Sequence, residues 1–186
     1  MASLQSALKN LSELSQENIE LFCSAAEPIK IRKNEFLLTE GNTCKNIWFI
    51  EAGFFRSFYL HDGHEINTAF HFEGSFVTNV KSLRMEKPAE YSIVAGENAF
   101  VYRFSRQDML KLYAQSKEIV EFGKKLIEML FITEQEYGNL FRLFSAQERY
   151  EYILKNNPFI LQRIPLGQLA SYLGMSRETL SRMRKK

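Results

Sequence analysis

The residues best suited to do chemistry lie near the end of the sequence, where two arginines and a glutamate follow a serine. Arg177 and Glu178 come directly after Ser176, and Arg182 follows little more than one helical turn later. Ser176 is a residue type that caps helices. Arginine can bond O6 and N7 of guanine together, and glutamate can accept from N4 of cytosine. This spacing predicts that Arg177, Glu178 and Arg182 read DNA bases from a recognition helix in the major groove.

Other polar residues of the same segment are suited to contact phosphate. Hydroxyl and basic groups position a protein on DNA without specifying its sequence. We expect phosphate contacts from Ser171, Ser176, Thr179, Arg184, Lys185 and Lys186. The alternative is a solvated helix end whose basic residues only complement the helix dipole.

Two short helices must hold these residues. Leu169, Leu173 and Leu180 supply apolar positions, Ala170 supplies a small side chain where two helices can cross, and Gly174 suits a tight left-handed turn. These features predict a helix-turn-helix in residues 166–183.

The charge distribution also points to the end of the chain. The formal net charge is only +2, but residues 157–186 contain six arginines and lysines against one acidic residue, Glu178. The remainder contains more acidic than basic residues. We therefore expect only the C-terminal end to meet a polyanion, namely double-stranded DNA.

A long helix is predicted before this segment, at residues 113–144. Its apolar residues recur at close to 3.5-residue spacing, at Ile119, Phe122, Leu126, Leu130, Tyr137, Leu140 and Phe144. A second copy of the helix could cover this stripe and form a homodimer. The alternative is that the stripe packs on the rest of its own chain. Ser145 and Glu148 then form a capping box for the next helix, which ends before Pro158.

The first half of the chain predicts mainly strands. Residues 4–26 favour two short helices, with Ser15 as a cap. From Ile29 to Phe104, aromatic and β-branched runs are separated by turns at Gly41, Gly53, Asp62-Gly63, Gly74 and Gly96. We predict an α+β chain: an antiparallel double-stranded β-helix (jelly-roll) sensor domain in residues 1–112, a long dimerisation helix in 113–144, and a small all-α helix-turn-helix domain in 145–186.

These motifs resemble those of the Crp/Fnr transcription regulators, which join a cyclic-nucleotide-binding-like β-roll to a C-terminal helix-turn-helix. "SRETLSR" (176–182) resembles the recognition helix of that family, "EGNTCKNIWFIEAGFFRSF" (40–58) its early β-roll, and "FEGSF" (72–76) the turn before its ligand cassette. The resemblance implies a cytoplasmic homodimer that reads a pseudo-palindromic site and works with RNA polymerase. It also implies an effector bound at the cassette, which is here residues 74–95.

The cassette departs from that pattern. Its family counterpart carries a Gly-Glu pair for ribose and an arginine for the cyclic phosphate, whereas the corresponding slots here are Thr78-Asn79 and Ala89-Glu90. A buried phosphate without a cation is costly, so we do not expect cyclic AMP in the usual pose. The effector is left open, with Gly74, Thr78, Asn79, Ala89 and Glu90 as the cassette positions to inspect. An apolar effector pocket, or ordinary roll core, could be formed by Trp48, Phe49, Phe54, Phe55, Phe58, Phe70, Phe72 and Phe76.

The sequence is compatible with two other classes of function. A cupin-like metalloenzyme would use His61, His64, Glu65 and His71, but a DG turn between the first two places them at a solvent-exposed tip. A sensor whose C-terminal motif binds protein would have little use for an Arg-Glu base-reading pair. Cys23 and Cys44 are too few for an iron-sulfur cluster, although His71 leaves haem open. We therefore expect a non-enzyme without a cofactor or metal.

The two ends of the sequence carry further expectations. The N-terminus lacks the apolar run of a signal peptide, and no long apolar stretch follows, so a cytoplasmic protein without membrane spans is expected. Only Arg184, Lys185 and Lys186 follow the recognition helix, so a wing is expected to be missing or to precede the motif.

Overall fold

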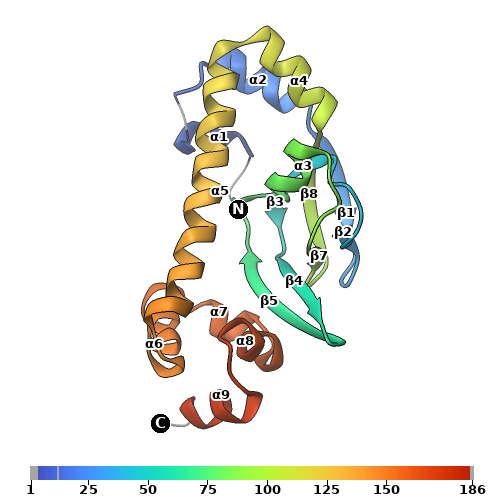
Figure 1. Ribbon diagram of the computed structural model, residues 1–186. Coiled ribbons are helices and arrows are strands. Elements are labelled where there is room, and N and C mark those ends of the chain that lie inside the picture. The colour runs from blue at the N-terminus through green and yellow to red at the C-terminus, as the bar shows by residue number, and fades with distance from the viewer. Residues whose placement is uncertain (1–3, 12, 185–186) are drawn as a thin grey trace.

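The computed structural model describes residues 4–11 and 13–184, which form a β-roll, a long helix beside it, and a group of short C-terminal helices (Figure 1). The roll is preceded by α1 (Leu4–Leu11) and α2 (Gln16–Ser24). Ser15 accepts a hydrogen bond from the backbone N–H of Asn18, so the predicted cap is confirmed.

The roll consists of two antiparallel four-stranded sheets, which confirms the predicted jelly-roll architecture. One sheet has the order β1 (Glu27–Ile31), β8 (Ala99–Ser105), β3 (Asn46–Ala52) and β6 (Phe76–Val77). The other has the order β2 (Phe36–Leu38), β7 (Ser92–Ala95), β4 (Phe55–His61) and β5 (His64–His71). A short helix, α3 (Val80–Met85), lies within the cassette.

Large aromatic side chains pack between the first sheet and the helices beside it. Phe49, Phe76 and Phe104 are fully buried on the same face of that sheet, the Phe104 ring lies 4.6 Å from the Phe22 ring of α2, and Phe76 packs edge-on against Phe49 with ring centroids 5.0 Å apart. Such pairs add to the free energy gained by removing apolar surface from water. The core of the roll therefore uses part of the aromatic set that the sequence suggested for an effector pocket.

The long helix begins at Lys117 and not at 113. Residues Arg106–Gln115 form a separate helix, α4, because Ser116 leaves the helical conformation and caps α5 (Lys117–Leu143) by accepting from the N–H of Ile119. At about 1.5 Å per residue, α5 is roughly 40 Å long. It runs beside the roll and reaches the C-terminal helices (Figure 1).

The apolar stripe of α5 packs mainly on its own chain. Ile119, Phe122 and Leu126 are buried in the core that they share with the roll, and Leu140 is buried further along. The stripe that suggested a dimer is therefore largely occupied within the protomer. The exposed apolar residues of α5 lie elsewhere on the helix, at Phe131 (59% exposed), Ile132 (49%), Phe141 (37%) and Leu143 (72%).

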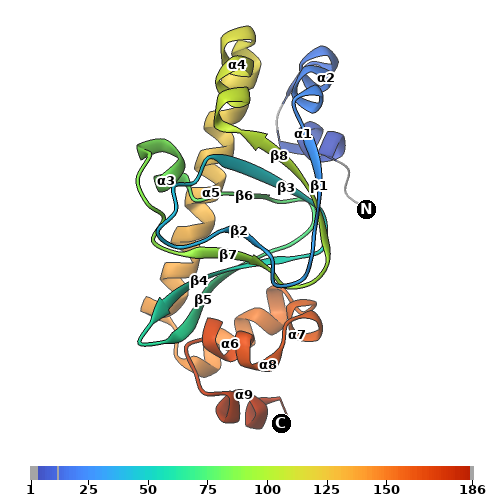
Figure 2. The same ribbon diagram turned by 90° about the vertical axis from the view of Figure 1, so that its right-hand side faces the viewer.

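Four short helices follow α5: α6 (Ala146–Asn156), α7 (Ile160–Arg163), α8 (Leu166–Tyr172) and α9 (Arg177–Met183). The capping box of Ser145 and Glu148 is present, as predicted. In Figure 2 these helices lie below the sheet edge formed by β4 and β5, with α9 farthest from the roll. Their core includes one residue of the roll, Phe54, which is 2% exposed.

Among the described residues, no helix is both long and apolar enough to cross a membrane.

Candidate functional site

The three predicted base readers lie together on the exposed side of α9. Ser176 caps the helix by accepting from the N–H of Thr179 at 3.1 Å, which places Arg177 and Glu178 in the first turn. Arg177, Glu178 and Arg182 are all exposed. Within residues 4–11 and 13–184, neither arginine forms a salt bridge.

The carboxylate of Glu178 is held in its ionised form. The backbone N–H of Glu178 itself, and then the hydroxyl of Ser176, hydrogen-bond to it and lower its pKa. An ionised carboxylate only accepts hydrogen bonds, and the exocyclic amine of cytosine only donates them. The start of α9 thus keeps Glu178 in the state that pairing with cytosine requires.

A tight turn joins α8 to α9. Gly174 has a φ of +63°, and the N–H of Met175 bonds the carbonyl of Ala170 at 3.0 Å. A side chain at Gly174 would also come within 2.8 Å of the Phe141 ring. Ala170 and Leu180 are buried, so the small residue and the apolar residue lie where the sequence places them in a helix pair.

The predicted phosphate contacts divide into three groups. Arg184 is exposed at the end of α9, and the hydroxyl oxygens of Ser176 and Thr179 lie 3.0 Å apart at its first turn. The hydroxyl of Ser171 is instead occupied: it donates to the carbonyl of Glu65 at 2.9 Å and accepts from the N–H of Asn67 at 3.0 Å. Lys185 and Lys186 lie outside the described residues.

The cassette positions are occupied by contacts within the chain. The Thr78 hydroxyl donates to the carbonyl of Asn46 at 2.8 Å, and Asn79 caps α3 by accepting from the N–H of Ser82 at 2.8 Å. Ala89 is 4% exposed and exchanges backbone hydrogen bonds with the 41–42 segment. Gly74 closes its turn by donating to the carbonyl of Ile50 at 2.9 Å.

Residues 89–90, where the family carries its phosphate-binding arginine, end in a carboxylate. Glu90 is ion-paired with Lys81, and the side chains are 58% and 59% exposed. The nearby Tyr91 is largely buried, and burial raises its phenol pKa well above the usual value. The slot therefore presents a negative group and its own counter-ion at the surface.

The aromatic set of the sequence analysis does not line a single pocket. Phe54, Phe70 and Phe72 face the C-terminal helices, whereas Trp48, Phe49, Phe55 and Phe76 belong to the roll core and Phe58 stacks on the Arg56 guanidinium. Alternation along a strand separates its two faces, but it does not show what covers each face. The set is thus divided between the core that the roll shares with α2 and α5 and the contact with the C-terminal helices, with Phe58 in neither.

The three histidines of the possible metal site do not lie together on the β4–β5 hairpin. His61 and His64 are exposed at its tip, as the DG turn predicted. His71 lies at the other end, half-buried, with its Nε2 atom 2.9 Å from the Ser57 hydroxyl. Within the described part of the chain, no three residues of the usual metal-binding types converge on one point.

An open groove of about 420 Å³ lies between α3 and α5. Val80 and Arg84 form its cassette side, and Ile127 and Phe131 form the α5 side. The groove therefore adjoins the exposed apolar part of α5.

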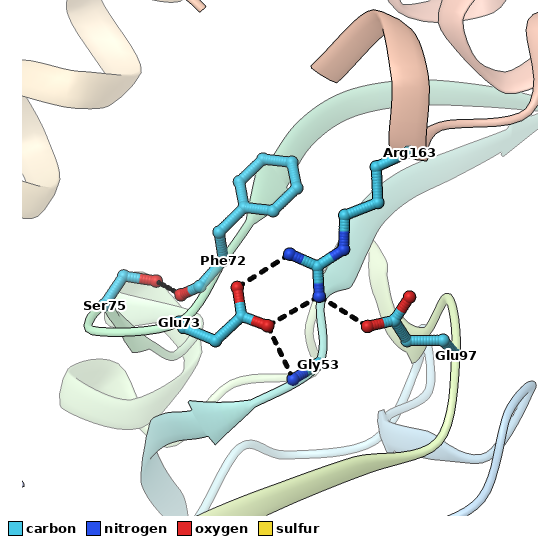
Figure 3. Close-up of polar contacts among 6 residues, drawn as sticks. All are labelled: Gly53, Phe72, Glu73, Ser75, Glu97 and Arg163. Carbon is cyan, nitrogen blue, oxygen red and sulfur yellow. Dashed lines mark hydrogen bonds and ion pairs between the residues drawn. The ribbon is translucent and has the colours of Figure 1, made fainter. Parts of the chain in front are cut away.

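A residue that joins the two parts of the chain, Arg163, was not predicted from the sequence (Figure 3). Arg163, at the end of α7, donates from both guanidinium arms to Glu73, at 2.8 and 2.5 Å, and is also ion-paired with Glu97. These partners are 90 and 66 residues away in sequence. Only the acidic character of residues 73 and 97 signals the contact, and local patterns do not connect them to Arg163.

The first half of the chain matches a known family. Residues 28–116 match the family model described as cyclic nucleotide-binding domain. These residues thus have the fold of a cyclic nucleotide-binding domain, and a long helix and small C-terminal helices follow them. No curated protein sequence was found to match the chain.

Solved structures of transcription regulators share this fold along most of the chain. A catabolite activator protein from Thermus thermophilus is 23% identical, with 97% of this chain and 85% of the other covered and a TM-score of 0.62. The c-di-GMP responsive global regulator CLP of Xanthomonas campestris is 15% identical, with 92% of this chain and 90% of the other covered and a TM-score of 0.73. A protein from Eubacterium rectale, described as a putative transcriptional regulator of the Crp/Fnr family, is 18% identical, with 96% of this chain and 84% of the other covered and a TM-score of 0.71. At these identities the comparison shows a shared fold.

Proposed function

We propose that the protein is a sequence-specific, DNA-binding transcription regulator of the Crp/Fnr type, in which α8 and α9 form the helix-turn-helix. The observation that carries the proposal is the first turn of α9, where Arg177 and Glu178 are exposed and, in the part of the chain that the structure describes, neither Arg177 nor Arg182 forms a salt bridge. Arg184, Ser176 and Thr179 supply phosphate contacts beside them, whereas Ser171 serves the contact with β5. The regulators that share the fold support the assignment.

The active form in this proposal is a homodimer that reads a pseudo-palindrome. The exposed Phe131 and the half-buried Ile127, four residues apart on α5, give an apolar surface for a second copy. Pairing of two such helices would set two α9 helices about one DNA turn apart.

Selection from random DNA with the purified protein tests this function. We expect enrichment of an inverted repeat whose half-sites are centred about 10 base pairs apart. A variant carrying both Arg177→Ala and Glu178→Ala is the matched control and should lose the motif while remaining folded. Failure of the wild-type protein to enrich any motif would reject the proposal.

The effector of this regulator is not cyclic AMP in the usual pose. The slot positions Thr78 and Asn79 are bonded to the chain itself, and Glu90 brings a negative charge to the place where the phosphate needs a cation. Calorimetric titration with cyclic AMP should give no heat of binding at micromolar concentrations, and saturable binding there would contradict this part of the proposal.

A further inference from the structure

One arginine of the C-terminal helices holds both ends of the cassette. Glu73 immediately precedes Gly74, where the cassette begins, and Glu97 follows its last residue, Ala95, by two positions. Arg163 bonds both carboxylates at once (Figure 3). A single guanidinium group therefore links the two ends of the cassette, and its contacts depend on their relative position.

The arrangement is more specific than an ordinary surface ion pair. Isolated exposed pairs contribute little because solvent screens them and the side chains lose freedom. Here the side chains of Arg163, Glu73 and Glu97 are only 30, 32 and 39% exposed. The guanidinium makes a two-armed contact and also lies 5.4 Å and 5.6 Å from the ring centres of Phe54 and Phe72.

The carboxylates are attached to backbone that hydrogen bonds hold in place. Glu73 also accepts from the N–H of Gly53 at 2.8 Å. Gly53 has a φ of +89°, and a Cβ there would lie 2.6 Å from the Cβ of Ala99, so this close approach requires glycine. The N–H of Gly96, next to Glu97, bonds the carbonyl of Phe54 at 2.9 Å. A shift of either end of the cassette would therefore move a carboxylate relative to Arg163.

A second contact docks the same helices independently of Arg163. Ser171 on α8 bonds the backbone of β5, and the hydroxyl of Tyr137 on α5 lies 3.1 Å from the carbonyl of Asn67 and 3.2 Å from that of Tyr172. Loss of Arg163 should therefore leave the C-terminal helices attached to the roll. What it removes is the link to the cassette.

From this geometry we propose that Arg163 is the residue that couples the conformation of the cassette to that of the α8–α9 pair. An effector that changes the cassette alters the separation of Glu73 and Glu97, and Arg163 transmits that change through α7 to α8. The coupling must act equally in both directions, because the cassette and the α8–α9 pair share one free energy of interaction. Its regulatory meaning rests on the proposed DNA-binding function, but the coupling itself does not require DNA.

Hydrogen exchange of the full chain, followed by mass spectrometry, tests the coupling. Arg163→Gln should raise exchange about fivefold or more in both the cassette helix (residues 80–85) and residues 166–183. The matched control is Arg103→Gln, which breaks an ion pair with Glu27 that lies on the same roll but away from the cassette. It should change neither segment.

Two milder variants keep the test valid if Arg163→Gln destabilises the protein. Arg163→Lys keeps the charge but cannot make the two-armed contact, and Glu97→Gln leaves the Glu73 pair intact. Each should raise exchange in both segments by a smaller factor. If exchange rises only in residues 160–183, Arg163 merely docks the helices and the proposal is overturned.

A change made in the cassette tests the opposite direction. Asn79→Ala removes the cap of α3, far in sequence from α8 and α9. In the wild-type background it should raise exchange in residues 166–183, and in the Arg163→Gln background it should add nothing there. Equal effects in the two backgrounds would show that no signal passes through Arg163.

A separate measurement distinguishes this proposal from the function on which its meaning rests. If DNA selection fails but the exchange results hold, the coupling stands and the DNA-binding assignment falls. If selection succeeds, Arg163→Gln should change the affinity for the selected site about fivefold or more, with Arg103→Gln unchanged. Unchanged affinity in Arg163→Gln would reject the regulatory role.

Discussion

At the scale of single residues, Glu178 combines a helix-forming role with the proposed base-reading role. It lies in the first turn of α9, where a negative charge is favoured by the helix dipole, and the residue is exposed to solvent. A contact with phosphate alone would gain nothing from this charge. The presence of Glu178 therefore favours a helix that reads base sequence over a helix that binds any polyanion.

Substitution of the base readers should cost affinity at individual base pairs. We expect Arg177→Ala or Glu178→Ala to weaken binding to the selected site by about 1–3 kcal/mol and to relax the preference at one position of each half-site. Arg184→Ala, a phosphate contact in the proposal, should instead weaken all sequences alike and reduce the salt dependence by about one charge. Fluorescence anisotropy with single-base variants of the site measures both effects, and equal losses on all sequences for Arg177→Ala would contradict its base-reading role.

His71 should make the stability of the protein depend on pH. Burial lowers the pKa of His71 from 6.5 to about 4. On acidification, His71 therefore becomes protonated near pH 6.5 in the unfolded chain but only near pH 4 in the native chain. The free energy of unfolding should thus be constant above pH 6.5 and fall by up to about 3 kcal/mol on acidification to pH 4. Urea unfolding between pH 7.5 and 4.5 measures this loss.

Two variants show whether His71 is the source of that loss. His71→Gln removes the titrating group and should flatten the dependence between pH 6.5 and 4.5. His61→Gln, at an exposed side chain on the hairpin tip, should leave the slope as in the wild type. A slope that survives in His71→Gln would place the titration elsewhere.

At the scale of elements, replacing glycine by alanine should have opposite effects on stability in the α8–α9 turn and in α5. Gly174→Ala forces a Cβ into a left-handed conformation and within 2.8 Å of Phe141, so it should lower the free energy of unfolding by about 1–3 kcal/mol. Gly138 lies inside α5, and a Cβ there meets nothing within 4 Å. Gly138→Ala should therefore stabilise the protein by roughly 0.5–1 kcal/mol. Denaturant unfolding of both variants checks the pair, and a neutral Gly174→Ala would mean that the turn can be rebuilt.

Local signals in the sequence predicted the elements well. The caps at Ser15, Ser145 and Ser176 are present because each depends on residues at most three positions away. The break at Ser116 was not expected, since a long run without proline resembles one continuous helix. The partner of the α5 stripe was also not predicted, because spacing shows which face is apolar and not what covers it.

At the scale of the whole molecule, the exposed apolar part of α5 should govern the oligomeric state. Phe131→Glu places a charge in the proposed interface and should weaken self-association at least tenfold, as expected for a buried aromatic contact. Leu110→Glu changes another exposed apolar residue, on α4, and is the matched control. Sedimentation equilibrium should show a dimer for wild type and Leu110→Glu, and a monomer-rich mixture for Phe131→Glu. A monomeric wild-type protein at micromolar concentration would contradict the dimer.

Contacts between distant parts of the chain were the least predictable features. Arg163 was counted only as part of a basic end, and Ser171 was expected to face phosphate, yet both bind the roll. Their partners lie more than 60 residues away, and neither charge nor spacing identifies a partner at that distance. The candidate readers were predictable because one short helix carries them all.

Phe54 has a consequence for how such a chain can be recombined. It belongs to the roll in sequence but is buried in the core of the C-terminal helices, with Phe70 and Phe72 beside it. A fusion that transplanted only residues 145–186 onto another domain would leave that core without one of its buried rings. The group of C-terminal helices is therefore not a freely exchangeable module, and a folded chimaera would have to carry the three phenylalanines with it.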